Sequence, residues 1–219
     1  LSYRRRTFRK QLFFGGAGED IMKQRKTSLS RQTKETRIDL ELDVDGRGVS
    51  DCNLGLGFIE HMLELLCRHS RMDIKIRAEG DLDVDDHHLV EDLGITIGQA
   101  IDQALGERRG ITRFGYAVLP MDEVLVVVSV DLGGRFAFGC DYRPQRETIG
   151  DLSVELIPHF FRALALEARM NLHFRFLDPG WNEHHRVEAM FKGFARSMRM
   201  ATSIDPETEQ EIPSTKGVL

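Results

Sequence analysis

Two matching stretches of the chain decide the fold. Residues 59–77 read IEHMLELLCRHSRMDIKIR, and residues 157–175 read IPHFFRALALEARMNLHFR. They align without a gap, so that Arg71-Met72-Asp73 lies over Arg169-Met170-Asn171. In each copy a segment with helical spacing of apolar residues is followed by a short strand-like segment. The repeat therefore indicates a chain built from two similar halves.

Each half can be extended outward from this repeat. The segment RIDLELDVDG at 37–46 alternates as a half-buried strand does, and VLVVVSVDLGGRFAFGCDY at 124–142 predicts two strands joined in a hairpin at Gly133-Gly134. A further amphipathic helix follows each copy, with its apolar face at Leu93, Ile97, Ile101 and Leu105 before Gly106, and at Val187, Met190, Phe191, Phe194 and Met198. We therefore predict strand, strand, helix, strand, helix in each of two halves, about 25–121 and 122–219. Together they form one α+β domain, 25–219, in which helices cover the sheets and an internal pseudo-twofold axis relates the halves.

Composition excludes several classes of protein. The 219 residues are 41% hydrophobic, which allows a sizeable core, and the formal charge of −5 argues against nucleic acid as a partner. No apolar run approaches the ~20 residues of a membrane span, so we expect no membrane partner. Cys52, Cys67 and Cys140 lack the paired spacing of a disulfide framework or a zinc ribbon. These features fit a cytoplasmic protein.

The first residues differ in character from the rest. LSYRRRTFRKQLFFGGAGED is basic and then glycine-rich, with no periodicity that continues into the following segment. A targeting segment is one interpretation, although its apolar part is too short for a signal peptide. We favour a disordered extension over residues 1–24, or an artefact of the gene model with Met22 as the true start.

Four of the eight histidines fall in two similar boxes, DDHHLVED at 85–92 and NEHHRVEA at 182–189. On a helix Glu91 shares a surface with His87 or His88, but the two histidines point about 100° apart. A His-His-x-x-Glu box is therefore suited to sending one histidine to each of two metal sites. Imidazole with carboxylate suits Mn, Fe, Co, Ni or Zn, and the absence of cysteine ligands argues against a structural zinc.

The remaining histidines differ in their relation to the repeat. His61 matches His159, so that symmetry alone nominates these two residues together. His173 lies on a strand, where the first half has Lys75. His69 fits the C-terminal end of a helix, where positive charge is favourable.

Other charged residues near the boxes have plain structural interpretations. The acidic residues around the first box either are solvated, or cap the helix that follows and orient a metal ligand. We favour the capping role for Asp85 or Asp86, and a solvated role for Asp81, Asp83 and Asp92. Arg108 and Arg109 fit the solvated end of a helix.

The sequence also resembles a known family. GDLDVDDHHLVEDLGITIGQA, RFG at 113–115, DLGGR at 131–135, NEHHRVEAMFKGFAR and the terminal STKG resemble imidazoleglycerol-phosphate dehydratase of histidine biosynthesis, in the family's order and from about Arg25 to Leu219. The resemblance implies dehydration of D-erythro-imidazole glycerol phosphate to imidazole acetol phosphate. It also implies two Mn²⁺ ions per active site and a homo-oligomer, a 24-subunit particle with its sites between subunits.

The resemblance assigns roles to individual residues. Matching motifs give the metal ligands as His61, His87, His88, Glu91, His173, His184, His185 and Glu188, among which His61, His87, Glu91 and Glu188 are also counted as catalytic. The family pattern thus selects His173 where the repeat selects His159. The substrate and its phosphate would be bound by Glu35, Arg113, Arg135, Lys192, Ser214, Thr215 and Lys216, and Glu35 is the candidate acid–base residue. Leu65 stands where the family often has glutamine, so any substrate contact of that glutamine is lost or replaced.

These parts suggest a mechanism. A ring held through both nitrogens by two metal ions can be bound as imidazolate and expel the C3 hydroxyl through a diazafulvene-like intermediate, while Glu35 shuttles the proton. A two-nitrogen ring needs two metals, which would explain two boxes. The rival hypotheses are a dinuclear metallohydrolase, a metal-binding or storage protein without turnover, and a relative that has lost activity.

Overall fold

The computed structural model describes residues 24–219, so the extension expected over residues 1–24 lies outside it except for Gln24. The first half contains β1 (Lys26–Gln32), β2 (Thr36–Asp43), β3 (Ser50–Asn53), α1 (Gly57–Ser70), β4 (Asp73–Gly80) and α2 (His87–Leu105). The second contains β5 (Phe114–Met121), β6 (Val124–Asp131), β7 (Ala137–Cys140), α3 (Leu156–Glu167), β10 (Asn171–Asp178) and α4 (Glu183–Thr202). A short ribbon, β8 (Thr148–Ile149) and β9 (Leu152–Ser153), precedes α3. Among these helices none has the length and apolarity needed to cross a bilayer.

The two halves share one topology, which confirms the predicted repeat. Residues 24–219 form two four-stranded sheets, ordered β1-β2-β4-β3 and β5-β6-β10-β7. In each sheet the last pair is parallel, β3 with β4 and β7 with β10, and the other pairs are antiparallel. The predicted α+β class with two related halves is therefore correct.

The strand prediction was wrong in two respects. Three strands of each four-stranded sheet precede the first helix of that half rather than two, and the second half adds the short β8–β9 ribbon. In the first half β3 spans only four residues and leaves a weak alternation signal, and in the second half β5 was not predicted. The hairpin at Gly133-Gly134 does not exist, since β10 lies between β6 and β7 and pairs with both. The hairpin of this half is β5–β6, closed by Asp122 and Glu123.

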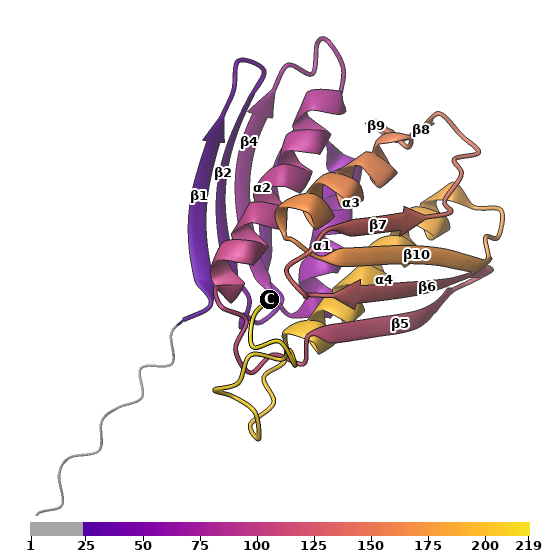
Figure 1. The fold of residues 1–219 in the computed structure, drawn as a ribbon. Helices are drawn as coiled ribbons and strands as arrows, with labels where there is room; N and C mark the ends of the chain where they lie inside the picture. Colours follow the sequence, from indigo (N-terminus) through magenta and orange to yellow (C-terminus); the bar gives the residue numbers. More distant parts are fainter. Residues whose placement is uncertain (1–23) are drawn as a thin grey trace, which may run out of the picture.

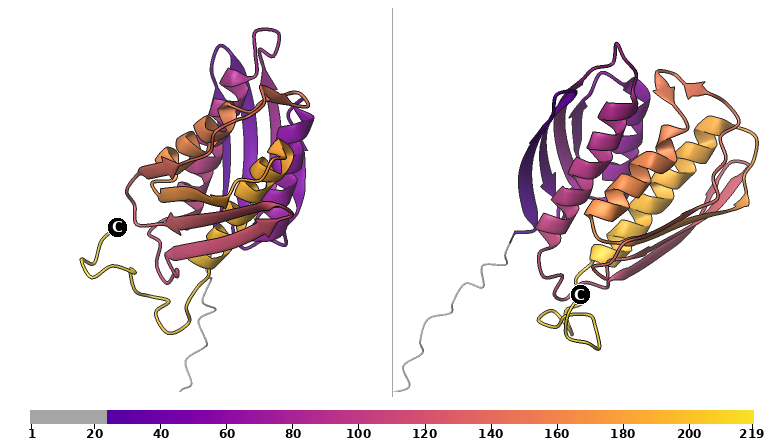
Figure 2. Two further views of the ribbon diagram at one scale, coloured as in Figure 1. Left: turned by 90° about the vertical axis from the view of Figure 1, so that its right-hand side faces the viewer. Right: turned by 45° about the horizontal axis from the view of Figure 1, so that its top comes forward.

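The helices lie between the two sheets, and each sheet turns one face toward them (Figure 2). Alternate residues of β2 and β6, such as Ile38 and Val128, are buried on that face. Two glycines of α2 allow a close approach to α3. A Cβ atom on Gly94 would lie 2.6 Å from the carbonyl oxygen of Phe160, and one on Gly98 would lie 2.5 Å from that of Leu164.

Arg108 joins the halves and is not the solvated residue that the sequence predicted. Its side chain is buried, donates to the carbonyl oxygens of Leu132 and Ala168 at 2.8 Å each, and pairs with Asp102. A buried guanidinium with this many acceptors is satisfied, so its burial is tolerated. The end of α2 is thereby fixed to the second half.

The N-terminal ends of the helices gather at one end of the molecule. Asp151 accepts from the backbone N–H groups of Gly57 (2.6 Å) and Phe58 (3.1 Å) at the start of α1, and Asp86 accepts from the N–H of Ser153 (2.6 Å) at the start of α2. The β8–β9 ribbon therefore links the two helix starts. The C-terminal tail lies at the opposite end, beside the end of α4 (Figure 1).

Candidate active site

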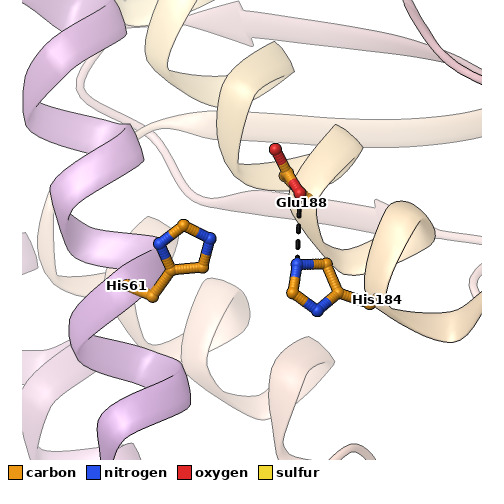
Figure 3. Close-up of side chains that lie close together, drawn as sticks. All are labelled: His61, His184 and Glu188. Carbon is orange, nitrogen blue, oxygen red and sulfur yellow. Dashed lines mark ion pairs between the residues drawn. The ribbon is translucent and has the colours of Figure 1, made fainter.

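One cluster of metal-binding side chains joins α1 to α4. Asn182 caps α4 by accepting from the N–H of His184 (2.9 Å), and Nε2 of His184 lies 3.2 Å from Oε2 of Glu188 one turn later. His61 faces them from α1, with its ring centroid 5.8 Å from that of His184 (Figure 3). One donor atom from each of the three residues lies within 4.8 Å of the others. This second-box cluster has the nitrogen and oxygen donors of a divalent transition-metal site.

A looser arrangement at α2 and α3 has the same plan. Nε2 of His87 lies 4.0 Å from Oε2 of Glu91, and the ring of His159 on α3 lies 5.8 Å from that of His87. His159 therefore holds, in this first-box cluster, the place that His61 holds in the other. Each cluster draws its residues from both halves of the chain, so neither half could build one alone.

The second histidine of each box is oriented by a carboxylate through Nδ1. His88 Nδ1 lies 3.0 Å from Asp81, and His185 Nδ1 lies 2.9 Å from Glu123. Such contacts fix the ring and turn Nε2 away from the orienting carboxylate, and Nε2 of His185 lies 3.5 Å from Oδ2 of Asp122. The hydrogen bond from His185 lowers the pKa of Glu123 to about 2, and the Asp81 carboxylate raises the pKa of His88.

Two acidic residues depart from the solvated role that the sequence predicted. Asp81 is bonded to His88 as described, and Asp92 is buried, paired with Arg31 at 2.8 Å and bonded to the hydroxyl of Thr36. The predicted capping role of Asp85 is consistent with the structure, because it accepts from the N–H of His87 at 2.9 Å. Asp92 thus ties the β1–β2 hairpin to α2.

That hairpin carries Glu35, the candidate acid–base residue. Its side chain is exposed, and its backbone carbonyl accepts from the N–H of Asp81 at 3.1 Å. The negative charge of Glu35 also contributes to the raised pKa of His88. The structure therefore brings Glu35 to the first box.

The candidate phosphate-binding residues lie mostly at the other end of the molecule. Arg113 pairs with Asp131 (2.7 Å) and donates to the carbonyl oxygen of Pro213 (2.9 Å), next to the predicted Ser214–Lys216 segment. Its backbone N–H bonds to Ala201, near the end of α4. Ala201 lies 17 residues after His184 and 13 after Glu188 on α4, so this end lies about 20 to 25 Å from the second-box cluster.

The other two predicted phosphate ligands have different positions. Arg135 is exposed near the tail, since a Cβ on the neighbouring Gly134 would lie 2.6 Å from the carbonyl carbon of Leu219. Lys192 is instead near the metal-binding end, where it pairs with Glu188 one turn along α4. A single copy of the chain therefore does not bring its candidate phosphate ligands together.

His173 does not join the other candidate ligands. It lies on β10 between the buried Leu172 and Phe174, so its exposed side chain points to the outer face of the sheet, away from the helices. A Cβ on Gly139 of the neighbouring β7 would lie 2.5 Å from its Nδ1. Within the chain the sheet itself separates His173 from both clusters.

A family model described as imidazoleglycerol-phosphate dehydratase matches residues 54–198, a segment that holds both boxes and the residues of both clusters. The chain belongs to this family. The imidazoleglycerol-phosphate dehydratase of Thermosynechococcus vestitus is 48% identical over 195 residues, 89% of this chain and 92% of that protein. The one from Koribacter versatilis is 49% identical over 195 residues, 89% of this chain and 100% of that protein. Dehydratases of this kind are hydro-lyases, and the chain is an enzyme of that class.

Solved structures of imidazoleglycerol-phosphate dehydratases have the same fold. The Staphylococcus aureus enzyme superposes with a TM-score of 0.75 at 34% identity, covering 82% of this chain and 99% of the other. The Pyrococcus furiosus enzyme, in complex with (S)-C348, superposes with a TM-score of 0.73 at 35% identity, covering 87% and 100%. The two-sheet, repeated architecture is thus that of imidazoleglycerol-phosphate dehydratases.

A pocket of about 560 Å³ lies beside His61. Its wall includes Leu65, Glu64 and Arg68. Arg68 was not singled out from the sequence, since an arginine near a helix end has no distinctive signal.

Three further residues of the site were missed or set aside. The register of the repeat pointed to His159, but the family match selected His173 instead. Asp81 and Glu123 had no local pattern that marks a carboxylate as the partner of a histidine. Glu123 could have been found by comparing the halves, because its hairpin is the counterpart of the one that carries Glu35.

Proposed function

We propose that the chain dehydrates D-erythro-imidazole glycerol phosphate to imidazole acetol phosphate, in histidine biosynthesis, at a site with two Mn²⁺ ions. One observation carries the proposal: two clusters of equivalent plan, each made of two imidazoles and a carboxylate, stand at one end of the molecule. The names of the relatives supply the reaction.

The donor set of the clusters fits manganese. Imidazole and carboxylate without thiolate suit Mn²⁺ among the metals that such ligands accept. When bound, the two ions would supply Lewis acidity toward the imidazole ring of the substrate. His61, His184 and Glu188 would hold one ion, and His87, Glu91 and His159 the other.

This ligand set uses His159 in place of His173. The equivalence of His159 and His61, each 5.8 Å from the first histidine of a box, supports the exchange. His173 stands on the far side of a sheet from both clusters. With His159 as a ligand, the proposed ligands of the two ions are related by the internal repeat.

The second histidines of the boxes complete the clusters of a neighbouring copy. Within residues 24–219 each cluster has three side chains, while His88 and His185 are oriented through Nδ1 and project apart from their neighbours in sequence. We place His88 of one copy in the second-box cluster of another, whose His185 enters the first-box cluster in return. The contact joins different surfaces and is heterologous, the kind of contact that forms a closed ring when its rotation closes, and we propose such closure within a 24-subunit particle.

The separation of the phosphate ligands supports a shared site as well. Imidazole glycerol phosphate is shorter than the roughly 20 to 25 Å of α4 that separate the second-box cluster from the end that contacts Arg113. Arg113, Arg135 and the Ser214, Thr215 and Lys216 tail would therefore bind the phosphate of a substrate held by neighbouring copies. Lys192 would serve the site at its own cluster.

Glu35 is the proton carrier in this proposal. Its exposed carboxylate stands beside His88, the ligand that crosses to the neighbouring copy, and can therefore reach a substrate held at that contact. We assign it the protonation of the departing C3 hydroxyl. Anchoring of the phosphate keeps the reacting carbon in register with Glu35.

The test is turnover of imidazole glycerol phosphate by protein that has been stripped with a chelator and then given Mn²⁺. Activity should vanish on stripping and return with Mn²⁺. Stoichiometric Mn²⁺ uptake without turnover would contradict the dehydratase assignment and favour a storage protein. Hydrolysis of a phosphate or amide substrate by the reloaded protein would favour a metallohydrolase.

A further inference from the structure

The chain exposes its single tryptophan next to the second box. Trp181 stands three residues ahead of His184, and 80% of its surface is accessible. An exposed apolar side chain alone carries little meaning, because much of any protein surface is apolar. The rigidity of the surrounding loop gives this one more weight.

Several contacts hold the Trp181 loop, residues 179–183, in a fixed shape. Oε1 of Glu123 accepts from the N–H groups of Trp181 (3.4 Å) and Asn182 (2.9 Å). The buried Arg186 of α4 donates to the carbonyl oxygens of Pro179 and Gly180, at 2.6 Å each. Glu123 is also the carboxylate that orients His185. The carboxylate of Glu123 thus fixes both the backbone that carries Trp181 and the imidazole of His185.

The first half has a counterpart in the Val84 loop, residues 81–86. Val84 stands three residues ahead of His87 and is 66% exposed, and Leu82 is partly exposed beside it. This loop is fixed as well, since Val84 N–H donates to the carbonyl oxygen of Asp81 (2.8 Å) and Asp86 binds Ser153. Both boxes therefore follow a rigid loop that offers an apolar side chain at the same position.

We propose that Trp181 of one copy packs against the Val84 loop of a second copy, and that this contact stabilises the metal-bridged interface. The inference rests on the proposed function, in which the first box of one copy meets the second box of another. If His88 and His184 of different copies share a metal, the loops that precede them meet across the same contact. A tryptophan that fills an apolar surface at the centre of such a contact is a frequent source of binding energy.

Fluorescence tests this directly, because Trp181 is the only tryptophan. Chelator-treated protein is titrated with Mn²⁺ while mass is followed by light scattering and dehydratase activity is assayed. As mass rises, the emission should move to shorter wavelength and quenching by acrylamide should be lost. A tryptophan that stays open to acrylamide while mass and activity rise would overturn the contact and leave the proposed function standing. A tryptophan already shielded before Mn²⁺ is added would also overturn it.

Variants identify the partner of Trp181. Trp181→Ala should raise the Mn²⁺ concentration needed for half-maximal assembly about tenfold or more. Val49→Ala, which trims a similarly exposed valine (57%) beside β3, is the matched control and should have no effect. Trp181→Ala and Val84→Ala combined should cost less than the sum of their separate effects, as expected for residues in contact. If the effects of the two substitutions add fully, Trp181 and Val84 are not in contact and the proposal is wrong. If the wild type neither assembles with Mn²⁺ nor turns over substrate, the proposed function is wrong as well.

Discussion

The hairpins that carry Glu35 and Glu123 occupy equivalent places in the two halves, but their carboxylates are used differently. Glu123 stands in a two-residue turn between β5 and β6, where it holds His185 and the backbone of the Trp181 loop. Glu35 stands in a longer turn between β1 and β2, where it is exposed, and Asp81 holds His88 instead. The two hairpins therefore carry similar carboxylates, of which one is bonded to a box histidine and the other is exposed.

The two clusters also differ, because the second-box cluster is more buried and more compact than the first-box cluster. The side chain of Glu188 is 11% exposed and lies 3.2 Å from His184, whereas that of Glu91 is 47% exposed and lies 4.0 Å from His87. The second-box cluster is thus closer to a finished metal site. We expect the wild type to fill it first as free Mn²⁺ rises, which competition with a chelator of known affinity would measure.

The largest effects should follow removal of the first histidine of either box. His184→Ala and His87→Ala should each lower kcat/KM by at least about 10³-fold, because a catalytic metal is worth several kcal/mol. Each variant should lose one of two metals per chain by elemental analysis. Full activity of either one would show that a single cluster suffices.

Glu35→Gln should reduce kcat by about 10² to 10⁴-fold, the usual contribution of general acid–base catalysis. Metal content should stay that of the wild type, because Glu35 is not a ligand in this account. Steady-state kinetics and elemental analysis on one preparation would check both. Loss of metal would contradict the role assigned to Glu35 and make it resemble Glu123.

Glu123→Gln should act on the metal, weakening Mn²⁺ binding by about 10 to 100-fold, as the loss of an orienting carboxylate does. Asp81→Asn, which removes the carboxylate bonded to His88, should have a smaller effect, since the side chain of Asp81 is more exposed than that of Glu123 (25% against 12%). Binding isotherms for both variants would rank them. Equal effects would remove the difference inferred between the halves.

The smallest predicted difference concerns the core. Burial raises the pKa of Cys67 on α1 from 9.0 to about 12, while the matching position on α3 is Ala165. Above pH 9 the unfolded thiol ionises and the folded one does not, so stability falls as pH rises toward 12. The loss between pH 9 and pH 10 should be roughly 1 kcal/mol, and Cys67→Ala should abolish this part of it. Urea denaturation at several pH values would measure the slope.

The sequence predicted the repeat and both boxes because those signals are local. Helical spacing and the His-His-x-x-Glu pattern lie within single elements. What could not be read depends on pairing across the chain. The position of β10 between β6 and β7, the burial of Arg108 against Leu132 and Ala168, and the contact of Glu123 with His185 join residues far apart in sequence. No local pattern encodes such contacts.

His159 illustrates the same limit. The repeat nominated it, but only the packing of α3 on α2 brings its ring beside His87. The strand position of His173 was visible in the sequence, whereas the face of the sheet to which it points was settled by the burial of Leu172 and Phe174. Motif matching predicts that a histidine is the ligand, but the packing of the elements determines which histidine can reach the site.

Mixing two inactive variants tests most directly whether the site is shared between copies. His87→Ala disrupts the first box, and His184→Ala disrupts the second. A site that combines the first box of one copy with the second box of another can therefore be intact in a mixed assembly. After joint dissociation with chelator and reassembly with Mn²⁺, an equal mixture should regain about a quarter of wild-type activity, as random pairing across a heterologous interface requires. No recovery in assemblies shown to contain both variants would place both metals of each site within one chain and contradict the account.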